Sequence, residues 1–436
     1  MRILHTSDWH LGHRLYDRDR TAEHTAALAW LLDTIAHEKV ELLVVAGDVF
    51  DTMNPSNAAR QLYYDFLGKL PATGCRAAII VGGNHDSPSL LDAPLGLMRN
   101  QNLHVVGGKR AETDDQVFRL TLTGADAGAG EGREAVVVAA VPFLRERDLR
   151  YAIAGEAPEA RKDRVRASIL EHYERIGAAA ERLRADPTTP ILATGHLFAA
   201  GGTDADDKAS HIYMADRNNI AAGQFPAAFD YVALGHIHQA QRVGGREAVR
   251  YSGSLIPLTF GEARRPQTVA VFDLVHAGQD VSVRQLTVPR FRQLHSMRGT
   301  AAAVTDQLTA FAAEQRLDGG AALTPWLEIR VETPHPLPTL RDELRTIVEP
   351  APAAAGEAPV PPTAEILRTS TVRPAGQVSA AAAATVDLSE LNPEDVFFRL
   401  CHGNDPAAEP RPDYDDLLAS FRELRSWLAD QDSPAE

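Results

Sequence analysis

Five short clusters of Asp, Asn and His are the residues of this 436-residue chain whose types and spacing could do chemistry. They are Asp8-Trp9-His10, Gly47-Asp48-Val49-Phe50-Asp51, Gly83-Asn84-His85-Asp86, Gly195-His196 and Gly235-His236-Ile237-His238. Carboxylate, amide carbonyl and imidazole together suit Mn²⁺, Fe²⁺ or Zn²⁺, whereas the absence of Cys from the clusters disfavours soft metals. The clusters therefore predict a site for divalent metal ions.

The clusters hold enough ligands for two ions that share one carboxylate. The candidate ligands are Asp8, His10, Asp48, Asn84, His196, His236 and His238. A pair of ions about 3.5–4 Å apart is the arrangement that clamps a phosphoryl group. A single Asp-x-His or Gly-His pair is more often a turn or surface feature, so the metal interpretation depends on all five clusters occurring together.

Each cluster follows an apolar run that reads as a buried strand, and amphipathic stretches lie between these runs. The predicted strands cover residues 2–5, 42–45, 77–81, 135–141, 191–194 and 231–234, and the predicted helices cover 21–38, 56–70 and 161–184. This alternation indicates an α/β fold layered around sheets. In such folds ligands collect beyond the carboxyl ends of the strands, which is where the five clusters fall.

The pattern changes near Pro289. Helices are predicted at 301–315 and 339–348 and strands at 326–331 and 364–372, which together indicate a small α+β domain. An Ala/Pro run at 349–362 is expected to be a disordered insertion, and an Ala run at 380–384 a linker. Residues 393–400 and 414–428 carry apolar residues at helical spacing and indicate a helical tail that needs a partner.

Bulk properties narrow the class of protein. No apolar run is long enough to cross a membrane and the N-terminus lacks a signal-peptide pattern, so a cytosolic address is expected. Cys75 and Cys401 are too isolated to suggest a disulfide framework or a thiolate metal site.

The net charge of −15 argues mildly against a nucleic-acid partner, although bound divalent ions would add positive charge locally. Two groups of basic residues could track a phosphate backbone despite the acidic total: Arg14, Arg18 and Arg20 after the first cluster, and Arg264 and Arg265 further on. A solvated basic face is the alternative interpretation of both groups.

Taken in order, Asp-x-His, Gly-Asp-x-x-Asp, Gly-Asn-His-Asp, Gly-His and Gly-His-x-His resemble the motifs of the calcineurin-like metallophosphoesterases. Within that superfamily, residues 6–12, 46–52, 82–87, 251–254 and 260–262 are similar to the SbcD family of bacterial nucleases. The Gly-Asp-x-Val-Asp-Arg-Gly and Gly-Asn-His-Glu motifs of the serine/threonine phosphatases are absent. The resemblance implies a layered β-sandwich core flanked by helices, with a smaller α+β cap and a helical C-terminal tail.

The resemblance also implies a role for each motif residue. The first ion would be held by Asp8, His10, Asp48 and His238, and the second by Asp48, Asn84, His196 and His236, with Mn²⁺ as the ion in both places. His85 would donate a proton or hydrogen bond to the scissile phosphate, and Asp86 would orient His85. Archaeal and eukaryotic relatives carry His where this chain has Asp51, which either orients the site or is a turn residue.

The resemblance implies three regions of the chain with different functions. Residues 1–288 would be the nuclease domain, 289–375 a capping and DNA-binding domain, and 376–436 a linker and tail. The tail helices at 393–400 and 414–428 would dock on SbcC, a coiled-coil ATPase, and this chain would bind no nucleotide itself. A homodimer through the helices at 56–70 and 87–100 would make the complex a heterotetramer. The apolar residues Leu90, Leu91, Leu95, Leu97 and Met98 could be that interface or ordinary core.

The function that follows is an Mn²⁺-dependent DNA nuclease. It would act as a 3′–5′ exonuclease on double-stranded ends and as an endonuclease on single-stranded and hairpin DNA, in DNA break processing in the cytoplasm at the nucleoid. The alternative is a calcineurin-like phosphatase or small-molecule phosphodiesterase on the same scaffold. A scaffold without activity is disfavoured because the ligand set is complete.

Overall fold

The computed structural model describes residues 1–122, 134–149, 157–199, 220–317, 323–333, 339–349, 362–372 and 417–421. The chain divides into two compact units, residues 1–372 and 373–436. In the second unit only the helical segment 417–421 is described. The predicted linker and the tail helix at 393–400 therefore lie outside the described residues, as does almost all of the predicted Ala/Pro insertion.

Four parallel strands, with two antiparallel strands on one side of them, make the first sheet, in the order β14-β13-β1-β4-β5-β6. Its strands are β1 (Arg2–Thr6), β4 (Leu42–Ala46), β5 (Ala77–Val81), β6 (Leu103–Val106), β13 (Thr268–Asp273) and β14 (Val283–Thr287). The parallel strands β1, β4 and β5 all end at the same edge, and each of the first three clusters follows one of them.

The second sheet has the order β11-β12-β10-β9-β8-β7, and its four central strands are parallel. Its strands are β7 (Val117–Leu122), β8 (Glu134–Ala139), β9 (Ile191–His196), β10 (Tyr231–Gly235), β11 (Gln241–Val243) and β12 (Arg246–Tyr251). The last two clusters come at the ends of β9 and β10, so this sheet supplies the remaining candidate ligands.

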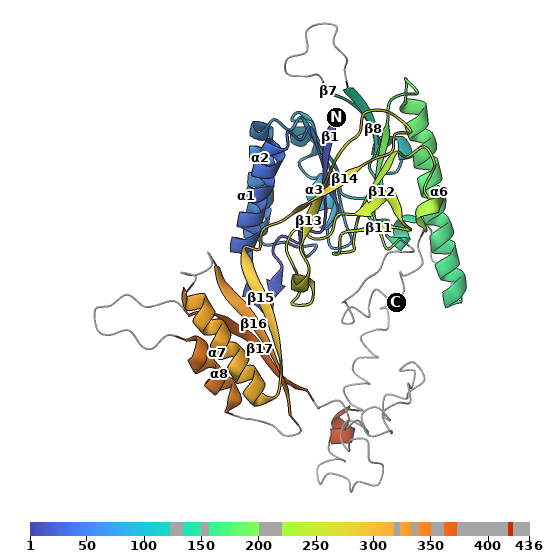
Figure 1. The fold of residues 1–436 in the computed structure, drawn as a ribbon. Coiled ribbons are helices and arrows are strands. Elements are labelled where there is room, and N and C mark those ends of the chain that lie inside the picture. The colour runs from blue at the N-terminus through green and yellow to red at the C-terminus, as the bar shows by residue number, and fades with distance from the viewer. Residues whose placement is uncertain are drawn as a thin grey trace. The chain divides into compact units, whose positions relative to one another are not determined.

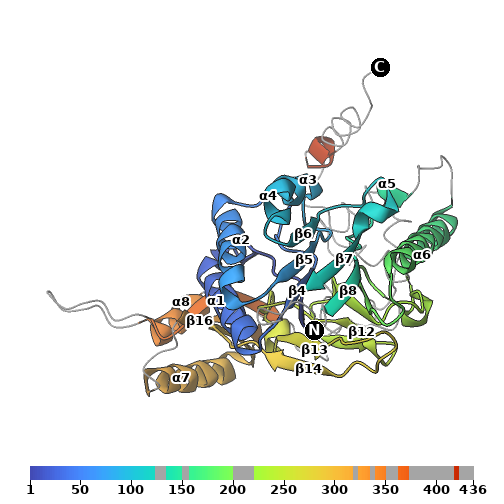
Figure 2. The ribbon, with the colours of Figure 1, turned by 90° about the horizontal axis from the view of Figure 1, so that it is seen from above.

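The two sheets pack face to face through one hydrophobic cluster, in which Ile3 and Ile79 of the first sheet join Val138 and Leu192 of the second. The strands are apolar along their length because both faces of each sheet are covered. Helices α1 (Thr21–His37) and α2 (Asn57–Lys69) cover the outer face of the first sheet, and α6 (Pro158–Leu183) covers that of the second (Figures 1 and 2). This helix–sheet–sheet–helix layering confirms the predicted class.

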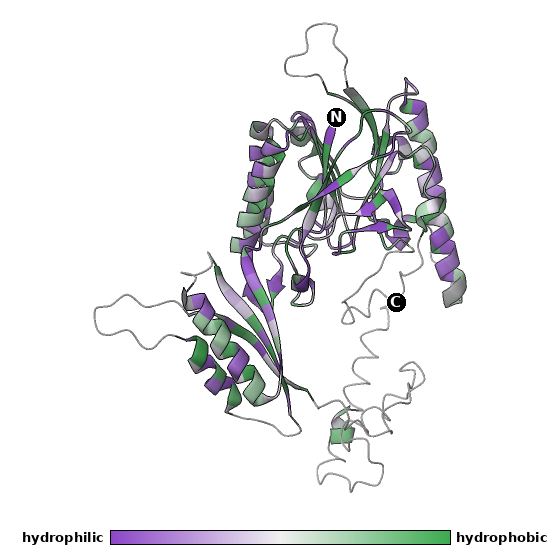
Figure 3. Ribbon diagram, in the orientation of Figure 1, coloured by the Kyte–Doolittle hydropathy of each residue, from purple (hydrophilic) through white to green (hydrophobic). Residues whose placement is uncertain are grey.

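The covering helices are amphipathic, and their colouring alternates between hydrophobic and hydrophilic along each one (Figure 3). In α1, Leu28, Leu31 and Ile35 recur at helical spacing and are buried against the first sheet. Helix α2 begins after Ser56, whose hydroxyl accepts the amide N–H of Ala59 at 3.2 Å as an N-cap. The observed bounds lie within three residues of those predicted for 21–38, 56–70 and 161–184.

The predicted helix at 87–100 is instead two short helices, α3 (Pro88–Asp92) and α4 (Leu95–Arg99). Pro94 lies between them, and a proline has no N–H for a helical hydrogen bond. Leu91 and Met98 are buried in the core of the first sheet's outer face. They belong to the core, while Leu90 and Leu95 are partly buried against it.

Short elements complete the core region. They are β2 (Arg14–Leu15), β3 (Arg18–Asp19), α5 (Glu146–Leu149) and the 3₁₀ turns η1 (Leu70–Thr73), η2 (Thr113–Gln116), η4 (Ala222–Gln224) and η5 (Glu262–Arg264). In the described parts of the chain, no helix is both long and apolar enough to cross a membrane.

The region after residue 290 forms a three-stranded parallel sheet in the order β15-β16-β17, with two helices. Its elements are β15 (Arg292–Gly299), α7 (Ala301–Leu317), β16 (Leu323–Glu332), α8 (Leu340–Val348) and β17 (Glu365–Val372). It has its own core, which includes Val304, Leu327 and Leu344. The helices and strands predicted here are present, whereas β15 was not predicted. The domain boundaries stay a prediction, because residues 1–372 cluster as one unit.

Candidate metal centre

Backbone and side-chain hydrogen bonds tie the cluster loops of both sheets together. The amide of Asp8 donates to the carbonyl of Gly47 at 3.0 Å, which joins the loops after β1 and β4. The amide of His236, at the end of β10, donates to the Asp8 carboxylate at 3.0 Å. His196 Nδ1 lies 2.8 Å from the carbonyl oxygen of Ala46. Residues far apart along the described core therefore meet at one edge of the sandwich.

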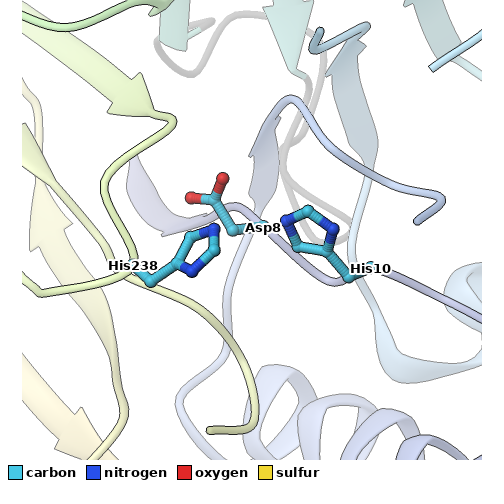
Figure 4. Close-up of side chains that lie close together, drawn as sticks. All are labelled: Asp8, His10 and His238. Atoms are coloured by element: carbon cyan, nitrogen blue, oxygen red, sulfur yellow. The ribbon is translucent and has the colours of Figure 1, made fainter. Parts of the chain in front are cut away.

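One group of candidate ligands combines Asp8, His10 and His238, whose ligand atoms lie within 4.8 Å of one another. Figure 4 shows the Asp8 carboxylate between the two imidazole rings. Nε2 of His10 is buried and has no hydrogen-bond partner. A buried polar atom without a partner is costly unless something binds it, and a metal ion at this position would satisfy it.

A second group combines Asp8, Asp48 and His196, again within 4.8 Å. The side-chain oxygen of Asn84 adds to it, at 3.0 Å from His196 Nε2 and 3.1 Å from His236 Nδ1. All seven predicted ligands are thus brought together. Their donor set of carboxylate, amide oxygen and imidazole fits hard or borderline divalent ions.

Asp8 belongs to both groups, and Asp48 of the second group also reaches the first. Its Oδ2 is 3.2 Å from Nε2 of His196 and 3.5 Å from Nε2 of His10, so one oxygen reaches a member of each group. Its other oxygen, Oδ1, accepts the amide N–H of His85 at 2.9 Å. This placement suits a carboxylate shared between two ions.

Two of the candidate imidazole ligands have their far nitrogen held by a carboxylate. Nδ1 of His10 lies 3.1 Å from Asp51 Oδ1, and Nδ1 of His238 lies 3.2 Å from Glu262 Oε1. Such outer carboxylates fix the ring orientation and leave Nε2 facing the ion. Asp51 therefore contacts a ligand directly, which was one of its two predicted roles. Glu262 was not singled out, although the Phe-Gly-Glu segment that contains it was one of the signals of family resemblance.

In the metal-free site, protons on His196 and His238 balance the negative charges of nearby carboxylates. Burial alone would raise the pKa of Asp48, but the adjacent His196 and His10 lower it well below its usual range. Burial opposes charge on His196, yet Asp48 raises the pKa of His196 to about 9. Glu262 likewise outweighs burial and raises the pKa of His238 to about 10. Bound metal would take the place of these protons.

Several ligands have an unusual backbone conformation. Asp8, His10 and Asp48 have φ of 51°, 47° and 49°, and His236 has φ of 102°. L-residues with a side chain rarely adopt positive φ, and such strained positions concentrate at functional sites. Gly83 lies in the same crowded region. Glycine is needed there because a Cβ would overlap the Asp48 carboxylate.

His85 lies beside this centre. Its Nδ1 is 2.7 Å from the carbonyl oxygen of Asp51, and its ring centroid is 4.9 Å from that of His10. The predicted bond from Asp86 to this ring is wrong: the fully buried Asp86 carboxylate accepts the amides of Gly83, Val49 and Phe50 at 2.8, 3.1 and 2.9 Å. Asp86 therefore ties together the loops that carry Asp48 and His85.

The arginines proposed for DNA contact are placed differently from one another. Arg20 is fully buried and paired with Glu23, so its predicted contact with DNA is wrong. Arg18 is exposed but forms an ion pair with Glu365 of β17. The side chains of Arg14, Arg264 and Arg265 are exposed. Their role with DNA stays a prediction.

Comparison with known proteins agrees with this geometry. Residues 1–240 match the model of the calcineurin-like phosphoesterase family, and residues 290–402 match a model described as the type 5 capsule protein repressor C-terminal domain. A dimetal phosphatase of known crystal structure from Danio rerio is only distantly similar, with 14% identity and a TM-score of 0.37 over 66% of this chain and 99% of that one.

Curated relatives match over most of the chain. The SbcD component of nuclease SbcCD from Escherichia coli is 36% identical over 92% of this chain and 92% of its own length. The protein of the same name from Rhodobacter capsulatus is 33% identical over 91% and 93%. With the divalent metal site, these matches make the chain a metal-dependent phosphodiester hydrolase. It belongs to the calcineurin-like phosphoesterases and, within them, to the SbcD family.

Proposed function

We propose that this chain is a DNA nuclease that hydrolyses phosphodiesters with two Mn²⁺ ions. The observation that carries the proposal is the convergence of seven candidate ligands at one site, where one oxygen of Asp48 reaches a histidine of each ligand group. The curated relatives carry the name nuclease, which supports a polynucleotide substrate over a small ester.

The ligands divide between two ions in this proposal. Asp8, His10, Asp48 and His238 hold the first ion, and Asp48, Asn84, His196 and His236 hold the second. A bound ion pair supplies an activated water and neutralises charge on the phosphate. Asp51 and Glu262 keep Nε2 of His10 and His238 turned toward the first ion.

His85 supplies the proton chemistry. Its Nδ1 is held by the carbonyl of Asp51, which fixes the ring beside the ligands. Although ligand atoms of His10, Asp51 and His85 also lie within 4.8 Å of one another, we assign His85 to the substrate and not to an ion. From there the imidazole gives a proton or hydrogen bond to the phosphate as charge develops. Asp86 supports this arrangement by anchoring the loops that carry Asp48 and His85.

The relatives' name also guides the proposal for substrates and partners. We propose 3′–5′ exonuclease action on double-stranded ends and endonuclease action on single-stranded and hairpin DNA. The partner is SbcC, bound through residues 393–400 and 414–428, in a cytoplasmic complex at the nucleoid. A homodimer through the region of α2 makes it a heterotetramer, and the exposed side chains of Met53 and Tyr64 in this region support that contact.

The test compares DNA with a small ester. Purified wild-type chain, Asp48→Ala and the exposed control Asp280→Ala are incubated with Mn²⁺ and either a labelled duplex, a circular single strand or p-nitrophenyl phosphate. We expect wild type and Asp280→Ala to degrade DNA, and Asp48→Ala to lose at least about 10³-fold in rate because both ions lose a ligand. Turnover of the small ester alone would move the assignment to a phosphatase or small phosphodiesterase.

A further inference from the structure

A sixth strand end reaches the metal centre without carrying a ligand. Strand β8 runs parallel to β9, with Ala139 opposite Ala193, and the loop that follows β8 is Val141-Pro142-Phe143-Leu144-Arg145. The amide of Val141 donates to Thr194 Oγ1 at 2.7 Å, and the amide of Phe143 donates to the carbonyl of Gly82 at 2.8 Å. This loop therefore joins the second sheet to the third cluster of the first sheet.

Arg145 is the last residue of this loop before α5, which follows β8 in Figure 2. Its Nη2 donates to the carbonyl oxygen of Asp86 at 2.7 Å, and Asp86 directly follows His85 in the chain. Its Cζ is 5.9 Å from the ring centroid of Phe143. That ring lies edge-on to His196, with centroids 6.2 Å apart. The side chain is thus held against the loop that carries His85 and, through Phe143, on the side of the site where His196 lies.

Arg145 forms no direct ion pair in the described structure, although Asp148, Asp86 and Asp48 act on its charge at longer range. Its side chain is half-buried, and among the described residues no carboxylate lies within ion-pair distance of it. Burial lowers the pKa of Arg145, but a guanidinium stays protonated in a protein. The bond to Asp86 uses one of five N–H donors. A partly desolvated cation with donors to spare is stabilised by an anion placed beside it.

We propose that Arg145 binds a non-bridging oxygen of the substrate phosphate at the metal pair. The ligand class is an anionic phosphodiester, and the planar guanidinium matches the geometry of phosphate oxygens. Arg145 is thus a substrate-binding residue, distinct from the metal ligands and from His85. This inference rests on the proposed function, because it requires a phosphodiester at that position.

The experiment uses Arg145→Met, which removes the charge but keeps an apolar chain beside Phe143, and Arg145→Lys, which keeps a charge. Arg76→Met is the control, because Arg76 precedes β5 at the opposite edge of the sheet and pairs with Glu41. Kinetics with Mn²⁺ and bis(p-nitrophenyl) phosphate give kcat and KM. Calorimetry gives the Kd of Mn²⁺ and of inorganic phosphate for the Mn²⁺-loaded protein.

We expect Arg145→Met to lower kcat/KM and phosphate affinity by about 10- to 100-fold, the range for a hydrogen bond to a charged group. Arg145→Lys should recover part of this loss, and the Kd of Mn²⁺ should not change in either variant. Unchanged phosphate affinity in Arg145→Met would overturn the proposal. Equal losses in both variants with weaker Mn²⁺ binding would also overturn it, and would make Arg145 an anchor of the loop at residues 83–86.

Failure of the nuclease assignment gives a different result. If the wild-type chain hydrolyses the small diester but no DNA, the nuclease proposal fails while the comparison of Arg145 variants still decides this one. If the wild-type chain hydrolyses neither substrate, the phosphate Kd values of the loaded proteins decide it.

Discussion

The metal centre has two halves, the ligands of the proposed first ion and those of the second, and different parts of the molecule hold them in place. In the first half, the imidazoles of His10 and His238 are held by the side-chain carboxylates of Asp51 and Glu262. In the second half, His196 is held by the backbone carbonyl of Ala46 within β4. The first half can therefore be tuned by single substitutions, whereas the sandwich itself fixes the second.

Exposure is similar in the two halves, because each holds one buried imidazole, His10 or His196, and one partly exposed imidazole, His238 or His236. The side chain of His196 has no exposed surface, while that of His238 is 27% exposed. Solvent therefore reaches ligands of both halves, namely His238 in the first and Asn84 and His236 in the second. Because the second half is held by the backbone of β4 and the first by two side chains, the second half is the more rigid and the first can be adjusted by substitution.

The largest effect is expected from a residue that lies beside the ligands without belonging to either half. His85→Ala should lower kcat by about 10²- to 10⁴-fold, because a positioned proton donor is lost. The Kd of Mn²⁺ in both halves should stay unchanged, and the exposed His37→Ala serves as the control. Unchanged turnover would remove His85 from the mechanism, and weaker Mn²⁺ binding would place it among the structural supports.

Glu262→Gln sharpens the comparison, because it alters the support of one half only. Loss of the carboxylate at His238 should weaken binding of one Mn²⁺ by about 10- to 100-fold and leave the other unchanged. A two-site calorimetric titration measures both affinities, with Glu247→Gln as the control for loss of an acidic group elsewhere. Equal weakening of both sites would show that the halves are coupled and that the comparison does not hold.

Gly83→Ala tests how rigid the second half of the metal centre is. The new Cβ would overlap Asp48, and because the surrounding strands cannot move apart, the chain should lose about 1–3 kcal/mol of unfolding free energy. Gly68 in α2 has open space around it, so Gly68→Ala should instead gain about 0.5–1 kcal/mol. Urea unfolding measures both. Equal stability of Gly83→Ala and wild type would show that the Asp48 loop yields easily.

The smallest effect is a dependence on pH that differs with and without metal. In metal-free protein the pKa of His196 is raised from 6.5 to about 9, so its contribution to stability is complete below pH 6.5 and is lost as pH rises through about 9. His238 acts in the same direction up to about pH 10.

Thermal unfolding in a chelator should therefore show Tm falling between about pH 6.5 and 9. Mn²⁺ affinity should rise over the same window, because the ion competes with these protons. A chelated protein whose Tm does not fall across this window would contradict the proton balance described for the two halves.

The sequence predicts those features that depend on local pattern. Each ligand cluster directly follows a strand, so the end of an apolar run locates it, and the strand bounds lie within two residues of prediction for 77–81 and 191–194. Hydrogen bonds between loops could not be predicted in the same way. Asp86 is next to His85 in the chain, yet its carboxylate turns to amides that only the fold brings near.

Two further residues illustrate the same limit. Glu262 lies far along the chain from His238, and only the packing of η5 against the loop after β10 brings them together. Arg20 stands in a basic stretch and resembles a surface residue. Its guanidinium is paired with Glu23 one helical turn later and donates to the carbonyl of Pro257. The contact with Pro257 cannot be predicted from the local sequence.

The order in which the ligands occur along the chain has a consequence for biosynthesis. Asp8 follows directly after β1, whereas His238, its neighbour in the finished site, is made only after both sheets have most of their strands. The emerging N-terminal segment therefore has no complete site with which to capture an ion during early translation. Both ligand groups are complete only once the sandwich has assembled, so we expect the ion to bind the folded chain and to stabilise it.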